Sequence, residues 1–169
     1  RAMMLGAWHV GLATGVTLAG GFLFSRMVFS SESVSVRAMT RWSELLNPKL
    51  CGKPVTIAHR GGVVEAPENS LASFAVCKAQ GCAAVEIDVA SSKDQVAVLM
   101  HDDTVDRTTT GTGPVCSHTF AELQRFDLTA NHSEWERHRP QPVPSLEAAV
   151  AECKRVNLPI FLDIKDLTL

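Results

Sequence analysis

The sequence predicts an α/β fold in which a parallel sheet carries a polar site at one end. Four short β-rich runs each carry or lead into side chains capable of ion binding or acid–base chemistry, and helical patterns precede two of them. Enzymes with α/β barrels build their active sites at the C-terminal ends of the strands, so this repetition predicts a site of that kind. The four runs are residues 55–58, 83–89, 96–100 and 159–162.

The first part of the chain indicates a membrane anchor. Residues 2–24 contain no Asp, Glu, Lys or Arg, and a helix that crosses the ~30 Å hydrocarbon core needs about 20 residues. We therefore expect an anchor over residues 1–29, with the transmembrane helix at about 2–24, followed by a polar juxtamembrane connector over residues 30–52. A cleaved signal peptide and a buried soluble helix are the alternatives.

Two signals for membrane orientation disagree. Arg26, Arg37 and Arg41 follow the apolar segment, which by the positive-inside rule favours a cytosolic C-terminal side. Asn131 begins an Asn-His-Ser sequon, which favours glycosylation on a lumenal or extracellular side. The expectation carried forward is a plasma membrane or endomembrane vesicle location, with the domain from residue 53 onward on the lumenal or extracellular side.

The first two β-runs bring charged groups to their ends. The first leads directly into His59 and Arg60, a titratable group beside a fixed cation. In the second, Glu86 and Asp88 share one face of the strand while the apolar residues between them take the other. Two neighbouring acids are costly to bury, so a metal ion or a basic side chain is expected between them. A solvent-facing strand is the alternative.

Two helices are predicted in front of β-runs. The first can be capped by Asn69 or Ser70 and stops at Gly81, which tolerates a left-handed conformation. The second follows a cap at Ser145 and ends at Asn157. Strand, helix and strand in this order form a βαβ unit, and that unit makes the sheet parallel.

The later β-runs add further polar groups. One ends at Met100 and leads into His101 and Asp102, and the last leads into Asp163 and Lys165, which again share a face. Between them lies a long insertion.

The insertion, residues 103–144, is rich in Thr, Gly and Pro. A short helix is expected within it, opened by a capping box at Thr119 and Glu122. Asp106, Arg107 and the threonines that follow could hydrogen-bond a polar substrate or one another. An insertion of this length at a strand end predicts a substrate-facing lobe, with a variable surface loop as the alternative.

Composition excludes several classes of protein. The net charge of −2 arises from balanced acids and bases without a basic stripe, which argues against a nucleic-acid partner. The five cysteines are odd in number, scattered and free of zinc-type spacing, so neither a disulfide framework nor a zinc site is expected.

The remaining combination of groups suits phosphodiester cleavage. Glu86, Asp88 and Asp163 offer only oxygen ligands, which suit a hard divalent cation, Mg²⁺ or Ca²⁺. Such a cation beside Arg60 and Lys165 would offset charge on the non-bridging oxygens of a phosphate. The two imidazoles at the strand ends could divide the proton work, one accepting a proton from the attacking oxygen and one donating to the leaving alkoxide.

Several short motifs follow one another in the chain. They are Ile57-Ala58-His59-Arg60-Gly61, Pro67-Glu68-Asn69, Glu86-Ile87-Asp88, His101-Asp102, and Val105-Asp106-Arg107-Thr108-Thr109 with Gly111-Thr112-Gly113. This ordered set resembles the glycerophosphodiester phosphodiesterase family over about residues 56–165. A preceding apolar segment makes the membrane-anchored animal branch, which cleaves glycerophosphoinositol and related lipid-derived diesters, look most similar. The resemblance implies a TIM (β/α)8 barrel, of which residues 53–169 would form an N-terminal, truncated part.

The same resemblance implies roles for individual residues. His59 and His101 match the acid–base pair, and Arg60 matches a phosphate-binding position. Asp163 stands where the commoner pattern has Glu, so its shorter side chain could bind the ion directly or through water. The other implied roles are metal ligands at Glu86 and Asp88, the lysine after the third ligand at Lys165, and supporting positions at Glu68 and Asn69.

The expected activity is metal-dependent hydrolysis of glycerophosphodiesters to sn-glycerol 3-phosphate or lysophosphatidic acid and an alcohol. A related sphingolipid phosphodiesterase and an inactive, membrane-tethered interaction protein are the alternatives. Only 115 residues run from Val55 to Leu169, whereas a (β/α)8 barrel takes about 250. We therefore expect the chain alone to be inactive and to aggregate or depend on a partner.

Overall fold

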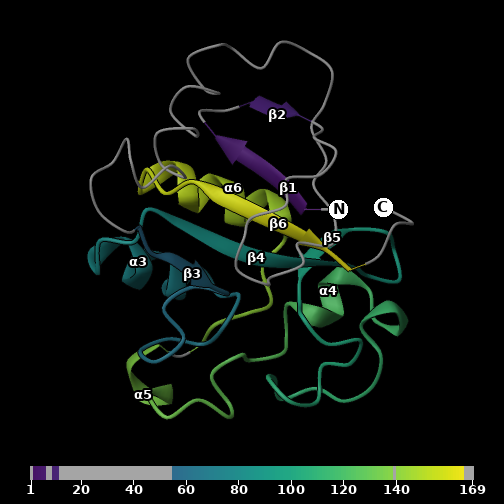
Figure 1. Cartoon of the computed structure of the whole chain (residues 1–169). Coiled ribbons are helices and arrows are strands. Elements are labelled where there is room, and N and C mark those ends of the chain that lie inside the picture. The colour runs from purple at the N-terminus through teal and green to yellow at the C-terminus, as the bar shows by residue number, and fades with distance from the viewer. Residues whose placement is uncertain (1, 7–8, 12–54, 139, 166–169) are drawn as a thin grey trace, which may run out of the picture.

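The computed structural model describes residues 2–6, 9–11, 55–138 and 140–165 (Figure 1). These residues form one sheet of six strands, in the order β2-β1-β6-β4-β3 with β5 paired to β4. The elements in chain order are β1 (Ala2–Gly6), β2 (His9–Gly11), β3 (Ile57–His59), α3 (Leu71–Ala79), β4 (Ala84–Ser91), β5 (Ala97–Leu99), the 3-10 turn η1 (Val115–Ser117), α4 (Phe120–Leu123), α5 (Trp135–His138), α6 (Leu146–Arg155) and β6 (Ile160–Ile164).

Strand β4 pairs in parallel with β3 on one side and with β6 on the other, which confirms the predicted α/β fold. His59 of β3 lies opposite Glu86 of β4, and Asp88 of β4 lies opposite Asp163 of β6. Helix α3 connects β3 to β4, and α6 precedes β6, so each parallel pair is joined through a helix. This register brings the polar ends of three strands to the same edge of the sheet.

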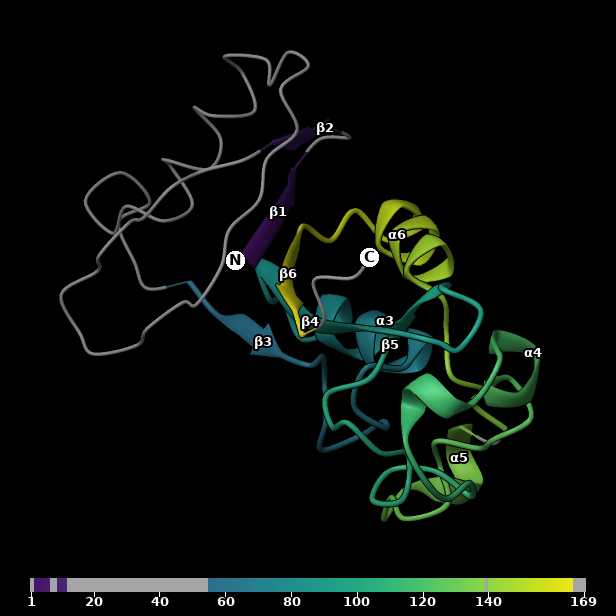
Figure 2. The same ribbon diagram turned by 90° about the vertical axis from the view of Figure 1, so that its right-hand side faces the viewer.

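Helices α3 and α6 cover one face of the sheet (Figure 2). Val85, Ile87 and Val89 point from β4 toward them and are buried, as the alternation in this strand predicts. Phe74 from α3 and Cys153 from α6 belong to the same apolar core. Removing this apolar surface from water therefore fixes Glu86 and Asp88 on the opposite face of β4.

Local signals set the helix ends. The Ser70 hydroxyl accepts a hydrogen bond from the Ser73 amide at the start of α3, so the predicted cap is Ser70 and not Asn69. Ser145 caps α6 in the same way through the Ala148 amide. These bonds satisfy amides that have no partner within the helix.

Strand β5 does not share the direction of the parallel strands β3, β4 and β6. It pairs antiparallel with the end of β4, with Leu99 opposite Val89. Because β5 folds back along β4, the Met100 amide donates to the Asp88 carbonyl and His101 returns to the same end of the sheet. A strand that runs in the opposite direction thus delivers the second histidine.

The insertion forms a lobe with its own core. Its short helix α4 begins with the predicted capping box, in which Thr119 and Glu122 exchange side-chain and backbone hydrogen bonds. Val105, Leu123 and Val143 are buried there together with Val98 of β5. The segment is therefore packed against the end of the sheet, although most of it lacks regular structure.

The described N-terminal residues are extended. Strand β1 pairs antiparallel with β2 and with β6. Pairing of this kind satisfies the backbone groups at the free edge of β6. The transmembrane helix expected at about 2–24 is not seen at residues 2–6 and 9–11, and the rest of that segment and the connector at 30–52 lie outside the described residues. Among the described residues, no helix has the length and apolar character needed to cross a membrane.

Candidate active site

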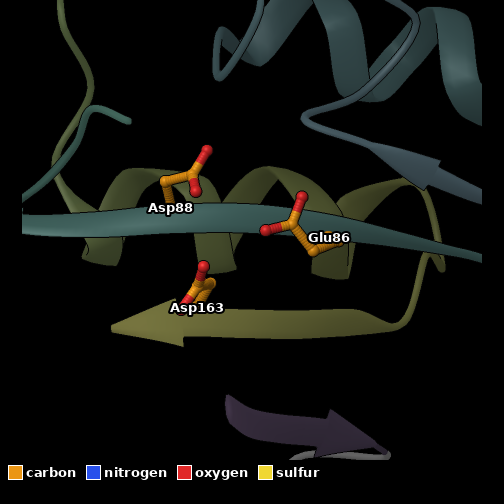
Figure 3. Close-up of side chains that lie close together, drawn as sticks. All are labelled: Glu86, Asp88 and Asp163. Carbon is orange, nitrogen blue, oxygen red and sulfur yellow. The ribbon is translucent and has the colours of Figure 1, made fainter. Parts of the chain in front are cut away.

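Three acids meet at the end of the parallel strands. One carboxylate oxygen from each of Glu86, Asp88 and Asp163 lies within 4.8 Å of the others. Glu86 and Asp88 come from alternate positions of β4, and Asp163 comes from the neighbouring strand β6 (Figure 3). The structure thus brings together the three residues predicted as metal ligands.

Asp88 is the most enclosed of the three acids, with a side chain only 1% exposed. Arg60 Nε lies 3.3 Å from its Oδ2, and Lys165 Nζ lies 2.9 Å from its Oδ1. Neither contact has hydrogen-bond geometry, so Asp88 Oδ1 and Arg60 Nε remain buried without a hydrogen-bond partner. A buried carboxylate oxygen in this state can still accept a cation.

Asn69 holds Asp88 from the other side. Its amide Nδ2 donates to Asp88 Oδ2 over 2.8 Å, and its Oδ1 accepts from the Asp88 backbone amide over 3.2 Å. Both partners are buried. These two hydrogen bonds fix the Asp88 carboxylate in one orientation.

Glu86 is held in an unusual electrostatic environment. Burial and the neighbouring Asp88 charge raise the pKa of Glu86 from 4.5 to about 7. The Arg60 amide donates to its Oε2 over 3.1 Å and opposes this shift only in part. Ionising Glu86 therefore costs more free energy here than in water, and a further positive charge beside it would lower that cost.

Lys165 follows β6 and partners two of the acids. Its Nζ donates to Asp163 Oδ2 over 2.6 Å and lies beside Asp88. Burial lowers the pKa of this amine, but the two carboxylates outweigh that effect and raise it above its ordinary value. Lys165 is thus a fixed positive charge at the edge of the acidic cluster.

The loop after β3 is strained where it enters the site. Arg60 has a φ of 59° and Gly61 a φ of 96°. A Cβ on Gly61 would lie 2.2 Å from Ser73 Oγ, so only glycine fits against α3. Left-handed residues other than glycine are sparse and cluster at functional sites. This turn directs the Arg60 amide and guanidinium toward β4.

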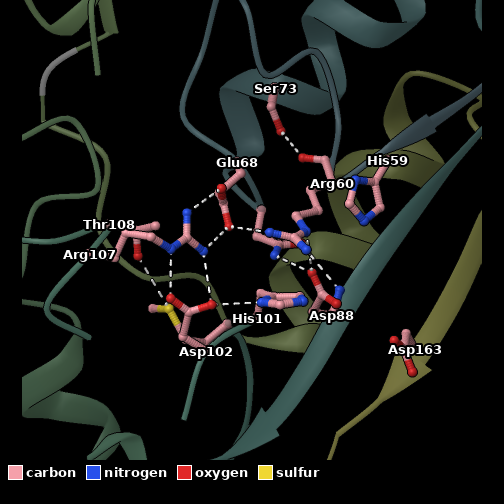
Figure 4. A network of polar contacts seen from close by, with 12 residues as sticks. His59, Arg60, Glu68, Ser73, Asp88, His101, Asp102, Arg107, Thr108 and Asp163 are labelled. Carbon is pink, nitrogen blue, oxygen red and sulfur yellow. Dashed lines mark hydrogen bonds and ion pairs between the residues drawn. The ribbon is translucent and has the colours of Figure 1, made fainter. Parts of the chain in front are cut away.

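A second network lies beside the acidic cluster (Figure 4). Arg107 donates to both carboxylate oxygens of Asp102, over 2.6 and 3.0 Å, and to both of Glu68, each over 2.9 Å. Glu68 accepts a further bond of 3.1 Å from Arg60 Nη1. Asp102 Oδ1 lies 2.7 Å from His101 Nδ1. In this network each acid has a basic partner.

His59 is the more exposed histidine, with 71% of its side chain accessible. Partial burial, followed by the charge of Arg60, lowers its pKa below the ordinary value of 6.5. Glu86 Oε2 lies 3.9 Å from its Nε2. His59 is therefore neutral at pH 7 and free to accept a proton.

The acidic cluster fits a hard divalent cation. It offers three carboxylate oxygens and no sulfur or nitrogen ligand, and its buried oxygen Asp88 Oδ1 has an ion-pair contact with Lys165 but no hydrogen-bond partner. Glu86, whose ionisation is suppressed, is the group that gains most from a nearby positive charge. Mg²⁺ and Ca²⁺ both suit this donor set.

Sequence reasoning gave Asp102 no role and predicted for Arg107 only hydrogen bonds to a polar substrate or to its neighbours. It missed the contact of Arg107 with Glu68, because these two residues are 39 positions apart in the chain. Asn131, the predicted glycosylation position, is exposed and donates to the Arg107 carbonyl over 2.9 Å. It lies near the network and outside the acidic cluster.

A small hollow of about 190 Å³ adjoins this network. Glu68 and Arg107 form part of its wall, so it shares two residues with the polar network. The other lining residues are Val63, Pro67, Thr108, Leu128, Asn131 and His132.

The C-terminal ends of the strands carry two imidazoles, an acidic cluster and fixed cations. A parallel βα sheet with these groups defines a phosphodiesterase class of site. The glycerophosphoryl diester phosphodiesterase family matches residues 59–168. The chain belongs to this family.

Curated relatives share this similarity. Glycerophosphodiester phosphodiesterase 1 of Homo sapiens is 42% identical over 149 residues, which cover 88% of this chain and 43% of the relative. The protein of the same name from Bos taurus is 43% identical over 138 residues, covering 82% and 40%. The chain thus spans less than half the length of these relatives.

Solved structures agree with this assignment. A phosphodiesterase of Oleispira antarctica, in complex with the product sn-glycerol-3-phosphate, has a TM-score of 0.61 at 36% identity and covers 66% of this chain and 44% of its own. A glycerophosphodiester phosphodiesterase of Agrobacterium tumefaciens has a TM-score of 0.58 at 32% identity, covering 64% and 46%. These neighbours have a TIM-barrel-like fold.

Proposed function

We propose that this chain carries the metal-binding and acid–base groups of a glycerophosphodiester phosphodiesterase. The reaction would hydrolyse a glycerophosphodiester to sn-glycerol 3-phosphate or lysophosphatidic acid and an alcohol. The observation that carries this proposal is the group of three carboxylate oxygens that lie within 4.8 Å of one another. Arg60 and Lys165 lie beside this group. His59 stands at the end of β3, and His101 follows β5.

The chain's own residues suggest how the proton work divides. His59, whose pKa is lowered, accepts the proton of the attacking oxygen. His101, when its ring is protonated on both nitrogens, keeps the Nδ1 proton toward the Asp102 carboxylate and donates the Nε2 proton to the leaving alkoxide. Arg60 and Lys165 bind the non-bridging phosphate oxygens and offset their negative charge. A cation held by Glu86, Asp88 and Asp163 would supply Lewis-acid stabilisation of the same oxygens.

The substrate class follows from the relatives. The Oleispira antarctica phosphodiesterase was solved with sn-glycerol-3-phosphate, which supports a glycerol phosphate product for this chain as well. Glycerophosphoinositol is the proposed diester. The hollow lined in part by Glu68 and Arg107 is the proposed place for the alcohol group of the diester.

Hydrolysis assays test this proposal. Purified chain and the human relative are incubated with glycerophosphoinositol or glycerophosphocholine, with chelator and with added Mg²⁺ or Ca²⁺. Chain length predicted an inactive chain, but the acidic cluster lies together in this chain, so we propose that a divalent cation supports hydrolysis and that chelator abolishes it. Activity unaffected by excess chelator would contradict the metal assignment. No hydrolysis of either diester by this chain, under conditions in which the human relative hydrolyses one of them, would contradict the function.

We also propose that residues 2–24 anchor the chain in a plasma membrane or vesicle membrane with the domain on the lumenal or extracellular side. The absence of charged residues over this stretch and the sequon at Asn131 support the proposal. A membrane helix and the pairing of β1 with β6 exclude each other in one molecule. Retention in membranes through alkaline carbonate extraction would favour the anchor, and complete release would contradict it. A glycosidase-sensitive mass shift lost in Asn131→Gln would support the orientation.

A further inference from the structure

Arg107 is the residue that joins the two histidine-bearing sides of the site. Its guanidinium forms a two-pronged contact with Asp102 and another with Glu68. Asp102 contacts His101, and Glu68 contacts Arg60, the neighbour of His59. Paired contacts of this geometry fix direction as well as charge.

The loop that carries Arg107 is itself held in place. Val105 is buried, and its amide donates to the Gly113 carbonyl over 3.0 Å. Thr109 is buried and donates both its amide and its hydroxyl to the Val105 carbonyl. The Asn131 side chain donates to the Arg107 carbonyl over 2.9 Å. The guanidinium, although 49% exposed at its side chain, therefore starts from a fixed backbone position.

The contact with Asp102 determines which nitrogen of His101 exchanges protons. A carboxyl group is ionised at neutral and alkaline pH even at its ordinary pKa, and the hydrogen bonds from Arg107 lower the pKa of Asp102 further. The same contacts hold Asp102 Oδ1 toward His101 Nδ1. An ionised carboxylate can only accept hydrogen bonds. The proton of a neutral His101 ring therefore resides on Nδ1, and Nε2 is left as the nitrogen that faces a reaction partner.

The contact with Glu68 acts on the other side. Burial raises the pKa of Glu68, but the hydrogen bonds and charges of Arg107 and Arg60 outweigh it and hold the pKa below its ordinary value. Ionised Glu68 thus bridges two guanidinium groups and orients Arg60, whose side chain is only 17% exposed.

We propose that Arg107 is a positioning residue that fixes the tautomer of His101 through Asp102 and the orientation of Arg60 through Glu68. It does not touch the acidic cluster in any contact that the structure gives for it. This inference rests on the proposed function for its kinetic consequences, but the state of the His101 ring can be measured without any activity.

The first test measures the ring directly. Nitrogen-15 NMR of the imidazoles, at alkaline pH where the rings are neutral, distinguishes the two tautomers, and His101→Gln assigns the signal. We expect an Nδ1–H tautomer in the unmodified protein and a mixture with Nε2–H in Arg107→Gln. An Nε2–H ring in the unmodified protein, or the same Nδ1–H ring in Arg107→Gln, would overturn the proposal.

The second test measures kinetics. Replacing a residue that orients a functional group typically costs about 10–100-fold in activity, so we expect a loss of this size in kcat for Arg107→Gln. Arg107→Lys keeps the positive charge but cannot form the paired hydrogen bonds, so it should recover only part of the kcat that is lost in Arg107→Gln. In an Asp102→Asn background, Arg107→Gln should cause a smaller further loss of kcat than in the unmodified protein, because only the route through Glu68 and Arg60 remains. Additive losses would overturn the route through Asp102.

A matched control separates positioning from general destabilisation. Arg155 on α6 makes a similar fork to Glu152, with bonds of 2.8 and 2.6 Å, but lies outside the site. Arg155→Gln should leave kcat and the His101 tautomer unchanged. If the unmodified protein hydrolyses no diester while the NMR result is as expected, the proposed function fails and the positioning role stands.

Discussion

The two groups of acids at the C-terminal ends of the strands differ in how their negative charge is compensated. Glu68 and Asp102 are each paired with Arg107, and both have lowered pKa values. Glu86 lies beside Asp88 and Asp163, and its pKa is raised to about 7. One group is neutralised by the chain itself, whereas the other is left short of positive charge.

This difference indicates what each group is for. Acids with basic partners from the same chain are already compensated, so they can hold Arg60 and His101 in place. Acids that face one another at a cost in ionisation free energy remain available to a cation from solution. Lys165 and Arg60 reduce that cost at Asp88, whereas the pKa of Glu86 stays raised to about 7.

Removing either histidine should have the largest effect on turnover, because one histidine lies beside each group of acids. We expect His59→Ala and His101→Ala each to lower turnover of glycerophosphoinositol by about 10²–10⁴-fold if each handles one proton. His118→Gln, which alters a ring bonded to the Thr112 carbonyl in the insertion, is the control. Near-normal turnover in either alanine variant would move that histidine to a structural role.

The pH dependence of stability should separate the two groups. Glu86 binds its proton more tightly folded than unfolded, so in chelator the free energy of unfolding should fall as pH rises from about 4.5 to 7. The change from this residue is up to about 3 kcal/mol. Thermal melts in chelator measure it, and Mg²⁺ or Ca²⁺ should offset the loss above pH 7. Glu86→Gln should flatten the slope, and an equal slope in that variant would refute the assignment.

A smaller effect is expected from the third acid. Asp163→Glu adds one methylene at a side chain that is 32% exposed, so the longer group has room to adjust. We expect Mg²⁺ or Ca²⁺ affinity, measured by titration calorimetry, to change by less than about tenfold, or ~1.4 kcal/mol. Asp163→Ala is the comparison and should weaken binding more. Equal affinities in the two variants would show that Asp163 is no ligand.

The smallest effect is expected from an acid–arginine pair outside the site. Arg155 and Glu152 form an exposed fork on α6, and exposed ion pairs contribute little to stability. Arg155→Gln should change the free energy of unfolding by less than about 0.5 kcal/mol in denaturant titrations. A loss of several times that size would mean that exposed forks in this chain, including the one at Arg107, act mainly on folding.

Local patterns were sufficient to predict much of the fold. The alternation in β4 placed its apolar residues in the core and its two acids opposite, and the capping signals at Ser70, Ser145 and Thr119 marked real helix starts. The direction of β5 could not be predicted, because a short apolar run has the same pattern in parallel and antiparallel pairing.

By itself, the sequence determined which chemical groups stand at the strand ends, because strand periodicity and helix caps depend on residues close together in the chain. The tertiary structure alone decided how those groups are paired. Asn69 meets Asp88 across 19 positions, and Glu68 meets Arg107 across 39. Such pairings depend on how the crossover helices and the insertion pack against the sheet, and packing of distant segments is not encoded in local spacing. The division between acids that are neutralised by the chain and acids left open to a cation therefore emerges only in the folded protein.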